Sequence, residues 1–181
     1  MISLTESSAE YHANTAIGSS DIRDFIRSPQ LFHDKRQGLV PEKETPAVIL
    51  GMLTHLAILE EEKYLGSIAV KPDDISFATK IGKEWKELHA DRTIITTADY
   101  AMIHMMRRRM PSQVKSLLCG GSSEVTVRNT LNGLSVQCRI DHWMRDQKQM
   151  SDLKTIGAIE DIEREIQKRG YHIQARWYQR I

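Results

Sequence analysis

The spacing of hydrophobic positions along the chain changes at Gly120-Gly121. Before these glycines, apolar residues recur every three or four positions, as between Ile22 and Ile26, and this spacing is typical of helices. Capping residues and prolines mark helix starts near Ser19 and at Pro29. Further helices are expected over residues 46–60, 79–89 and 98–110, with a short strand over 67–70.

After the double glycine, apolar and polar residues alternate, which is typical of strands with one buried face. Strands are expected over residues 124–130 and 134–141, and Asn132-Gly133 between them is a strong signal for a two-residue hairpin turn. A third short strand is expected over residues 150–154. Three consecutive strands of this kind predict an antiparallel meander.

Two helices are expected to follow the meander. The first begins at Thr155 or Gly157 and ends before Gly170, and the second begins at about Tyr171. Helices, then strands, then helices predict one α/β domain over residues 19–181, with a mainly helical N-terminal part. Residues 1–18 lack apolar periodicity and are expected to form a loose lead-in.

The helix expected over residues 46–60 is apolar on almost all sides, which is typical of a helix buried in a core. His55 interrupts it, four residues after Gly51. Two interpretations follow from this segment alone. His55 is a core histidine bonded to a backbone carbonyl, or it points into a functional site where Gly51 permits close packing.

Composition excludes several classes of protein. The chain has 181 residues, 27% of them charged, and a net charge of +1. This charge excludes a strongly basic protein that coats nucleic acid, although a local basic groove remains possible. The sequence lacks an apolar run long enough to span a membrane and a basic N-terminal stretch typical of secretion. We therefore expect a cytoplasmic protein without membrane contacts.

Only two cysteines occur, Cys119 and Cys138. They are too few for a disulfide framework, and a cluster held by four cysteines cannot be built from this chain. Both are expected to behave as small apolar residues in a reducing compartment. An iron–sulfur cluster is therefore not expected.

Cations gather after residue 101, with Glu124 as the only acid up to residue 128. They are Arg107, Arg108, Arg109, Lys115 and Arg128. Three of them end a predicted helix, where the helix dipole favours positive charge. In one interpretation they are therefore ordinary solvent-exposed cations without a ligand. A patch that faces phosphate groups is the other interpretation.

Candidate chemistry lies at the ends of the second and third predicted strands. Asp152 and Lys154 are two residues apart, so on a strand their side chains point to one face. Asp141 ends the preceding strand and can lie beside them. Carboxylates gathered in this way repel each other, and a divalent cation such as Mg²⁺ removes that conflict. Alternatively, Asp152 and Lys154 are solvated charges of an edge strand.

Several short motifs occur in a fixed order along the chain. They are Gly51-Met52-Leu53-Thr54-His55, Glu124, Cys138-Arg139-Ile140-Asp141, Ser151-Asp152-Leu153-Lys154-Thr155 and Gly170-Tyr171-His172-Ile173-Gln174-Ala175, followed by Tyr178. This order resembles the PD-(D/E)xK nucleases of the RecB-like type. The sequence around these motifs, including Ser20-Asp21-Ile22 and Ser28-Pro29, is similar to that of the RecE-type exodeoxyribonucleases of phages and prophages. The resemblance covers roughly residues 18–180.

The resemblance implies a restriction-endonuclease-like core, in which helices flank a mixed central sheet. It implies Mg²⁺ or Mn²⁺ held by Asp141 and Asp152, with Glu124 or His55 completing the site and the Leu153 carbonyl contributing. Lys154 would be the catalytic lysine. Gln174 and Tyr178, one helical turn apart, would contact the substrate backbone, and Thr155 is a further candidate for substrate binding.

The resemblance also implies an activity. RecE-type enzymes digest one strand of duplex DNA from its 5′ end, which exposes a 3′ single strand for recombination. Duplex DNA, a ring of identical subunits and a single-strand annealing recombination protein are the partners that this likeness suggests. The family continues past the helix that carries Tyr178, whereas this chain ends at Ile181. We therefore expect a nuclease domain that is shortened at its C-terminus, either as an excerpt of a longer protein or as the product of a shortened prophage gene.

Two other functions remain open from the sequence. The first is a catalytically inactive prophage remnant of the same fold that binds DNA or a recombination partner. The second is an unrelated α/β interaction protein whose carboxylates lie on the surface. Convergence of Asp141, Asp152 and Lys154 on one cleft would separate the nuclease from the interaction protein.

Overall fold

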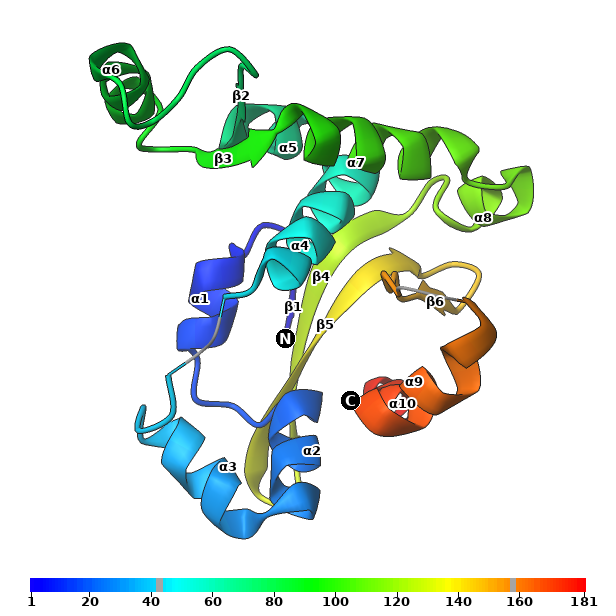
Figure 1. Ribbon diagram of the computed structural model, residues 1–181. Helices are drawn as coiled ribbons and strands as arrows, with labels where there is room; N and C mark the ends of the chain where they lie inside the picture. Colours follow the sequence, from blue (N-terminus) through cyan, green and yellow to red (C-terminus); the bar gives the residue numbers. More distant parts are fainter. Residues whose placement is uncertain (42–43, 157–158) are drawn as a thin grey trace. The chain divides into compact units, whose positions relative to one another are not determined.

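The computed structural model describes residues 1–41, 44–156 and 159–181 (Figure 1). The chain divides into two compact units, Met1–Lys43 with Gly120–Ile181 and Glu44–Cys119. We call the first the sheet unit and the second the middle unit. Both combine helices with strands, and helices flank the sheet of the sheet unit, so the expected α/β class is confirmed. One nuclease domain over residues 19–181 stays a prediction.

The sheet unit is built on four strands in the order β1-β4-β5-β6, and all neighbours are antiparallel. Their bounds are Ile2–Ser3 for β1, Ser122–Leu131 for β4, Leu134–Met144 for β5 and Gln149–Ser151 for β6. Ile17 adds an isolated parallel bridge to Val136. The turn at Asn132 and Gly133 has φ values of 51° and 79°, as a two-residue hairpin requires. The predicted hairpin is therefore confirmed.

The start of the chain is more ordered than the expected loose lead-in over residues 1–18, and that expectation is corrected. Strand β1 pairs with β4, and helix α1 (Ser8–Ala13) follows it. Ser7 and Glu10 form a reciprocal capping box that satisfies free backbone donors at the start of α1. Both elements are very short, so tertiary pairing and capping stabilise them rather than apolar periodicity.

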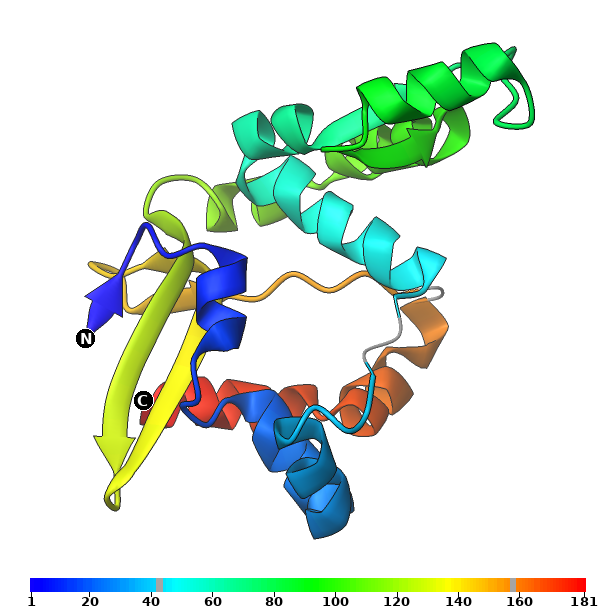
Figure 2. The same cartoon turned by 90° about the vertical axis from the view of Figure 1, so that its left-hand side faces the viewer.

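Four longer helices complete the sheet unit. They are α2 (Ser19–Arg27), α3 (Pro29–Arg36), α9 (Ile162–Arg169) and α10 (Tyr171–Arg180). Helices α2 and α10 lie side by side (Figure 2). At the corner between α9 and α10, Gly170 has φ +67°, and a Cβ atom there would lie 2.7 Å from the Arg23 side chain. The positive φ favours glycine here, and any side chain would also displace that of Arg23, where α2 meets this corner.

The segment before α9 differs from expectation. Thr155 lies outside any helix, and Gly157, the other predicted start, lies outside the described residues. The 3₁₀ turn η1 (Ile159–Asp161) leads into α9, so the regular helix begins later than predicted. The third strand also ends earlier, at Ser151, which leaves Asp152, Leu153 and Lys154 in an irregular segment.

One face of the β4–β5 hairpin carries the core of the sheet unit. Val125, Cys138 and Ile140 are almost fully buried there. Trp177 and Tyr178 of α10 pack against them. The core therefore fixes α10 against the two strands that carry Glu124 and Asp141.

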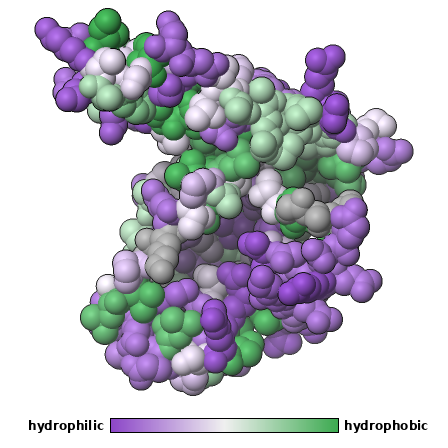
Figure 3. All heavy atoms as spheres, viewed as in Figure 1, coloured by the Kyte–Doolittle hydropathy of each residue, from purple (hydrophilic) through white to green (hydrophobic). Residues whose placement is uncertain are grey.

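The middle unit contains five helices and a pair of parallel strands among its described residues. The helices are α4 (Pro46–Leu59), α5 (Glu61–Ser67), α6 (Lys80–Leu88), α7 (Thr97–Arg109) and α8 (Ser112–Leu117), and the strands are β2 (Ile68–Lys71) and β3 (Thr93–Thr96). Leu53, Tyr64 and Ile103 form the centre of its core. On α4, Val48 and Met52 remain exposed, so the expectation of an α4 buried on all sides is wrong. Over α6, apolar side chains stand among charged ones (Figure 3).

Candidate nuclease site

Glu124 and Asp141 lie opposite each other on the β4–β5 hairpin. Ser123 is paired with His142 and Val125 with Ile140, so the register places the two acids in facing positions. A carboxylate oxygen of Glu124 lies within 4.8 Å of one of Asp141. Neighbouring strands thus bring together two acids that are seventeen positions apart in the sequence. Their expected part in a metal site stays a prediction.

The backbone at Glu124 adopts an uncommon conformation. Its φ of 55° lies in the left-handed region, which glycine and asparagine adopt far more readily than glutamate. Such a conformation costs about 1–3 kcal/mol and occurs preferentially at functional sites. The ladder between β4 and β5 is interrupted at this pair and resumes at Val125. The fold therefore sustains strain where a carboxylate faces Asp141.

Asp141 is also linked to the segment that follows β6. The Leu153 backbone N–H donates to the Asp141 Oδ2 atom at 2.7 Å. Asp141 is only 9% exposed, so this hydrogen bond helps to offset the cost of burying its charge. The bond holds the Asp152–Lys154 segment against β5 at Asp141, three residues before the strand ends at Met144.

Asp152 and Lys154 form an ion pair in this segment. The Asp152 Oδ1 atom accepts a hydrogen bond from Gln174 at 2.9 Å. The Lys154 ammonium group lies over the Tyr171 ring, 5.3 Å from its centroid. The two charged side chains share one space, as expected, although they stand on irregular backbone rather than on a strand.

Gln174 and Tyr178 connect this segment to β5. Gln174 donates to the Tyr178 hydroxyl at 2.7 Å, and that hydroxyl donates to the Arg139 carbonyl at 2.6 Å. Burial raises the pKa of Tyr178, so the hydroxyl stays protonated and can donate. Both side chains hold the site together, and their expected contacts with substrate stay predictions. Thr155 follows Lys154 and is half-buried, and its role in substrate binding also stays a prediction.

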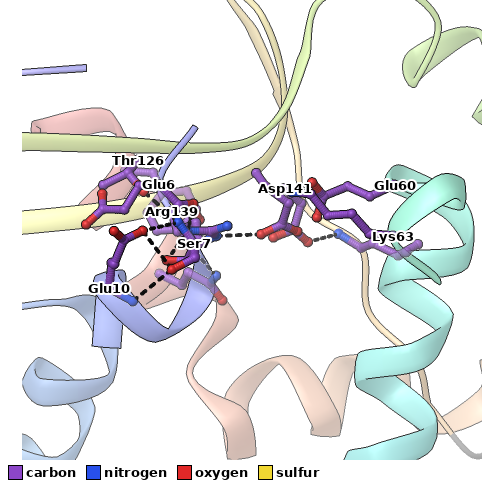
Figure 4. A network of polar contacts seen from close by, with 12 residues as sticks. Glu6, Ser7, Glu10, Glu60, Lys63, Thr126, Arg139 and Asp141 are labelled. Carbon is purple, nitrogen blue, oxygen red and sulfur yellow. Dashed lines mark hydrogen bonds and ion pairs between the residues drawn. The ribbon is translucent and has the colours of Figure 1, made fainter. Parts of the chain in front are cut away.

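Arg139 is a site residue that sequence reasoning missed. Its Nε atom donates to the Glu124 carboxylate at 2.6 Å. Its Nη1 atom donates to the Glu6 carbonyl at 3.1 Å, and Figure 4 shows Arg139 beside Glu6 and Ser7. The guanidinium group also lies over the Tyr11 ring. One signal was visible in the sequence, because Arg139 precedes Asp141 by two residues on a strand and so shares its face. Its partners in the N-terminal segment, Glu6 and Tyr11, could not be recognised from the sequence.

The N-terminal segment contributes a second ion pair beside this network. Glu6 pairs with Arg128, and both side chains are largely buried. The hydrogen bond from Arg128 is the main cause that lowers the pKa of Glu6. The segment before α1 is therefore fixed next to the strand that carries Glu124.

The donor set at the hairpin suits a hard divalent cation. Glu124 and Asp141 offer carboxylate oxygens, and Mg²⁺ prefers oxygen ligands at 2.0–2.1 Å. Two ligands on opposite sides of such an ion are about 4.2 Å apart, and the observed pair lies within 4.8 Å. Asp152 lies nearby but is engaged by Lys154 and Gln174. The Leu153 carbonyl, the other ligand predicted in this segment, lies 3.5 Å from the Lys154 ammonium group.

His55 stands on α4 of the middle unit, where it is half-buried. Its predicted part in a metal site stays a prediction.

The two cysteines do not form a disulfide. Cys119 is exposed, and Cys138 is buried in the sheet-unit core. Burial raises the pKa of Cys138 to about 12, so its thiol behaves as the small apolar group that was expected.

The comparison with protein families gives a match over residues 18–181. The matching family is described as a PDDEXK-like domain of unknown function (DUF3799). The chain belongs to this family. Because DUF3799 is PDDEXK-like, membership of the PD-(D/E)xK superfamily is confirmed. At the level of the family, this membership indicates a hydrolase of the nuclease type.

PD-(D/E)xK nucleases typically use divalent metals, which agrees with the carboxylates of Glu124 and Asp141. No curated protein and no solved structure matched the chain. Within the described residues, no helix is both long and apolar enough to cross a membrane.

Proposed function

We propose that the protein is a divalent-metal-dependent deoxyribonuclease that hydrolyses phosphodiester bonds of duplex DNA. One observation carries the proposal. Glu124 and Asp141 face each other on β4 and β5, and the Leu153 N–H fastens the Asp152–Lys154 segment directly to Asp141. Two carboxylates with a neighbouring aspartate–lysine pair form the chemical set that phosphodiester hydrolysis requires.

Each side chain has a role in this proposal. Glu124 and Asp141 would hold Mg²⁺ or Mn²⁺, with Asp152, the Leu153 carbonyl and His55 as the further ligands inferred from the family resemblance. The ion would polarise the phosphate and lower the pKa of a bound water. Arg139 offsets part of the Glu124 charge and holds that carboxylate in place. Gln174 orients Asp152 from the other side.

Lys154 supplies the positive charge of the site. Its ammonium group is held by Asp152 and by the Tyr171 ring, so it lies at a defined position beside the Leu153 carbonyl. A fixed cation there stabilises the negative charge that develops on the phosphate oxygens during attack by water. Lys154 would also orient that water. Thr155 and Tyr178 would lie along the substrate backbone.

The finer proposal concerns the mode of digestion. The order of the motifs and the sequence around them resemble RecE-type exodeoxyribonucleases of phages and prophages. This resemblance supports digestion of DNA from the 5′ end, for recombination in the cytoplasm. Under this proposal a single-strand annealing protein uses the exposed strand, and identical subunits form a ring around the duplex. Duplexes labelled at either the 5′ or the 3′ end test the polarity, because 5′-to-3′ digestion releases the 5′ label first.

The experiment compares hydrolysis of linear duplex DNA with Mg²⁺ by the unaltered chain and by Asp152→Asn and Lys154→Gln. Each variant is expected to lose about 100-fold or more in rate, because Asp152→Asn weakens a proposed metal ligand and Lys154→Gln removes the cation that stabilises charge on the phosphate. Asp146→Asn is the matched control, since Asp146 is exposed in the turn between β5 and β6. Equal rates for all four proteins would refute the assigned site.

A catalytically inactive DNA-binding protein is the second candidate, and one observation favours it. Asp152 is engaged by both Lys154 and Gln174, which is also what a purely structural ion pair would show. This alternative predicts salt-sensitive DNA binding by the unaltered chain without hydrolysis in either Mg²⁺ or Mn²⁺. Hydrolysis that stops when EDTA is added would exclude it.

A further inference from the structure

A hollow of about 650 Å³ lies in the middle unit beside the end of α7 and helix α8. We call it the basic hollow, and its polar lining consists of His104, Arg107, Arg108 and Lys115. A second hollow of about 530 Å³ shares His104 and Arg108 and adds Arg109. Both are formed by residues of the middle unit alone, outside the candidate nuclease site.

The charge of the basic hollow is only partly compensated. Arg107 forms hydrogen bonds to Glu61 through both terminal guanidinium nitrogens, and this contact lowers the pKa of Glu61 and raises that of Arg107. Arg108 and Lys115 are exposed, and no carboxylate among the described residues pairs with either. The basic hollow therefore presents positive charge that nothing in the described part of the chain neutralises.

The helix dipole does not account for this arrangement. Arg108 lies in the last turn of α7 and Lys115 in that of α8, and the helix dipole favours a cation at each place, but it does not explain why two helices direct their cations to one hollow. Each helix end carries at most roughly half an elementary negative charge. The two whole charges of Arg108 and Lys115 exceed the sum of these. The net charge around the basic hollow is therefore positive and attracts an anion.

His104 adds a second observation. Its Nε2 atom is buried and has no hydrogen-bond partner among the described residues. The ring is held by Tyr100, at 4.2 Å between centroids, and lies 6.0 Å from the Tyr64 ring. A buried side-chain nitrogen without a hydrogen-bond partner is uncommon. His104 lines the basic hollow beside Arg108, so an oxygen of a bound phosphate would supply the partner that Nε2 lacks.

We infer that the basic hollow binds a backbone phosphate of nucleic acid, at a site separate from the proposed nuclease centre. Arg108 and Lys115 would contact the phosphate, and His104 would donate a hydrogen bond to it. The adjoining hollow with Arg109 extends the cationic surface, which suits a ligand with repeated phosphates better than a single small anion. This inference rests on the proposed function, which makes duplex DNA the ligand.

The test is equilibrium binding of a short labelled DNA duplex to the full chain in EDTA, so that no hydrolysis occurs. Removing two phosphate contacts in Arg108→Gln/Lys115→Gln is expected to reduce the slope of log K against log salt by about 2, since each contact contributes about 1. Lys80→Gln/Lys83→Gln on α6 is the matched control, because it removes two exposed lysines of the same unit outside both hollows. Its slope is expected to equal that of the unaltered chain.

Three results would overturn the inference: an unchanged slope for Arg108→Gln/Lys115→Gln, an equal loss in the control, or an unaltered chain that does not bind the duplex. The proposed function is judged separately by hydrolysis in Mg²⁺. Hydrolysis with an unchanged slope refutes only the basic hollow, whereas a reduced slope without hydrolysis refutes only the nuclease.

A second measurement uses the unaltered chain and therefore does not depend on whether the variant folds. Titration with inorganic phosphate is expected to shift the imidazole resonances of His104 more than those of His172, which is exposed on α10. Equal shifts for the two histidines would contradict a phosphate site in the basic hollow.

Discussion

At the scale of single residues, the strained backbone of Glu124 gives a direct prediction. Glu124→Gly and Glu124→Ala both remove the carboxylate and its bond to Arg139, but only glycine adopts a φ of 55° without strain. Glu124→Gly is therefore expected to be more stable than Glu124→Ala by about 1 kcal/mol. Urea unfolding of the two variants measures the difference, and equal stabilities would show that no strain is stored there.

The buried thiol of Cys138 predicts how stability changes in alkali. Its pKa is raised by burial from 9.0 to about 12, so the unfolded chain loses this proton first as the pH rises. Stability from this group is complete below pH 9 and is lost between pH 9 and about 12.

The loss from Cys138 is at most about 4 kcal/mol, because one pKa unit corresponds to about 1.4 kcal/mol. Free energies of unfolding at pH 8 and pH 10.5 for the unaltered chain and for Cys138→Ala measure it. Cys138→Ala is expected to be less stable at pH 8, because it leaves a cavity, but to lose less stability on going to pH 10.5. An equal loss in both proteins would contradict a thiol that stays protonated in the fold.

At the scale of elements, α10 contacts β5 in the part of the strand between the Ile17 bridge at Val136 and the residues paired with β6. Trp177 donates from its indole N–H to the Gln137 carbonyl at 3.0 Å, and Tyr178 donates to the Arg139 carbonyl. The short β6 pairs only with the end of β5, at residues 142–144. Helix α10 thus satisfies edge carbonyls that would otherwise lack partners, and it places Gln174 beside Asp152.

Tyr178→Phe tests this link between α10 and β5. The variant keeps the ring in the core but leaves the Arg139 carbonyl and the Gln174 amide without the hydroxyl. A loss of about 1–3 kcal/mol in the free energy of unfolding is expected, because the partners are largely buried. Gln179→Ala is the control, since its exposed side chain leaves the Tyr178 hydroxyl bonds intact. Similar losses in both variants would argue against the link.

Sequence patterns predicted most of these elements but not all of the geometry. Alternation identified β4 and β5, and Asn132-Gly133 identified their turn, because both signals are local. Strand β1 has two residues and depends on pairing with β4, so no local pattern marks it. The extent of β6 was overpredicted because Asp152 and Lys154 continue the alternation, whereas the bond between Leu153 and Asp141 takes the chain off the strand path.

The acids of the candidate site could be predicted from the sequence, but the residues and backbone geometry that hold them in place could not. Asp141, Asp152 and Lys154 stand out as charges at the ends of apolar runs. Arg139 did not, because an arginine on a strand face is usually solvated, and its partner Glu124 is fifteen residues away. The positive φ of Glu124 could not be predicted either, since glutamate is not a residue that favours it.

At the scale of the whole molecule, the sheet unit carries a set of acids that suits a metal ion, and the middle unit carries the basic hollow. Membership of the PDDEXK-like family agrees with the first of these features. A nuclease needs both charge that binds a cation at the reacting phosphate and charge that attracts the nucleic acid backbone. The two kinds of charge lie on different parts of this chain.

The central claim is that Glu124 and Asp141 bind a divalent cation, and calorimetric titration with Mn²⁺ tests it without relying on activity. The unaltered chain is expected to bind Mn²⁺. Glu124→Gln and Asp141→Asn are each expected to weaken that binding at least 10-fold, since loss of even a supporting residue around a metal costs about 10–100-fold. Asp146→Asn is expected to bind as the unaltered chain does. Equal Mn²⁺ affinity in all four proteins, or no binding by the unaltered chain, would contradict the claim.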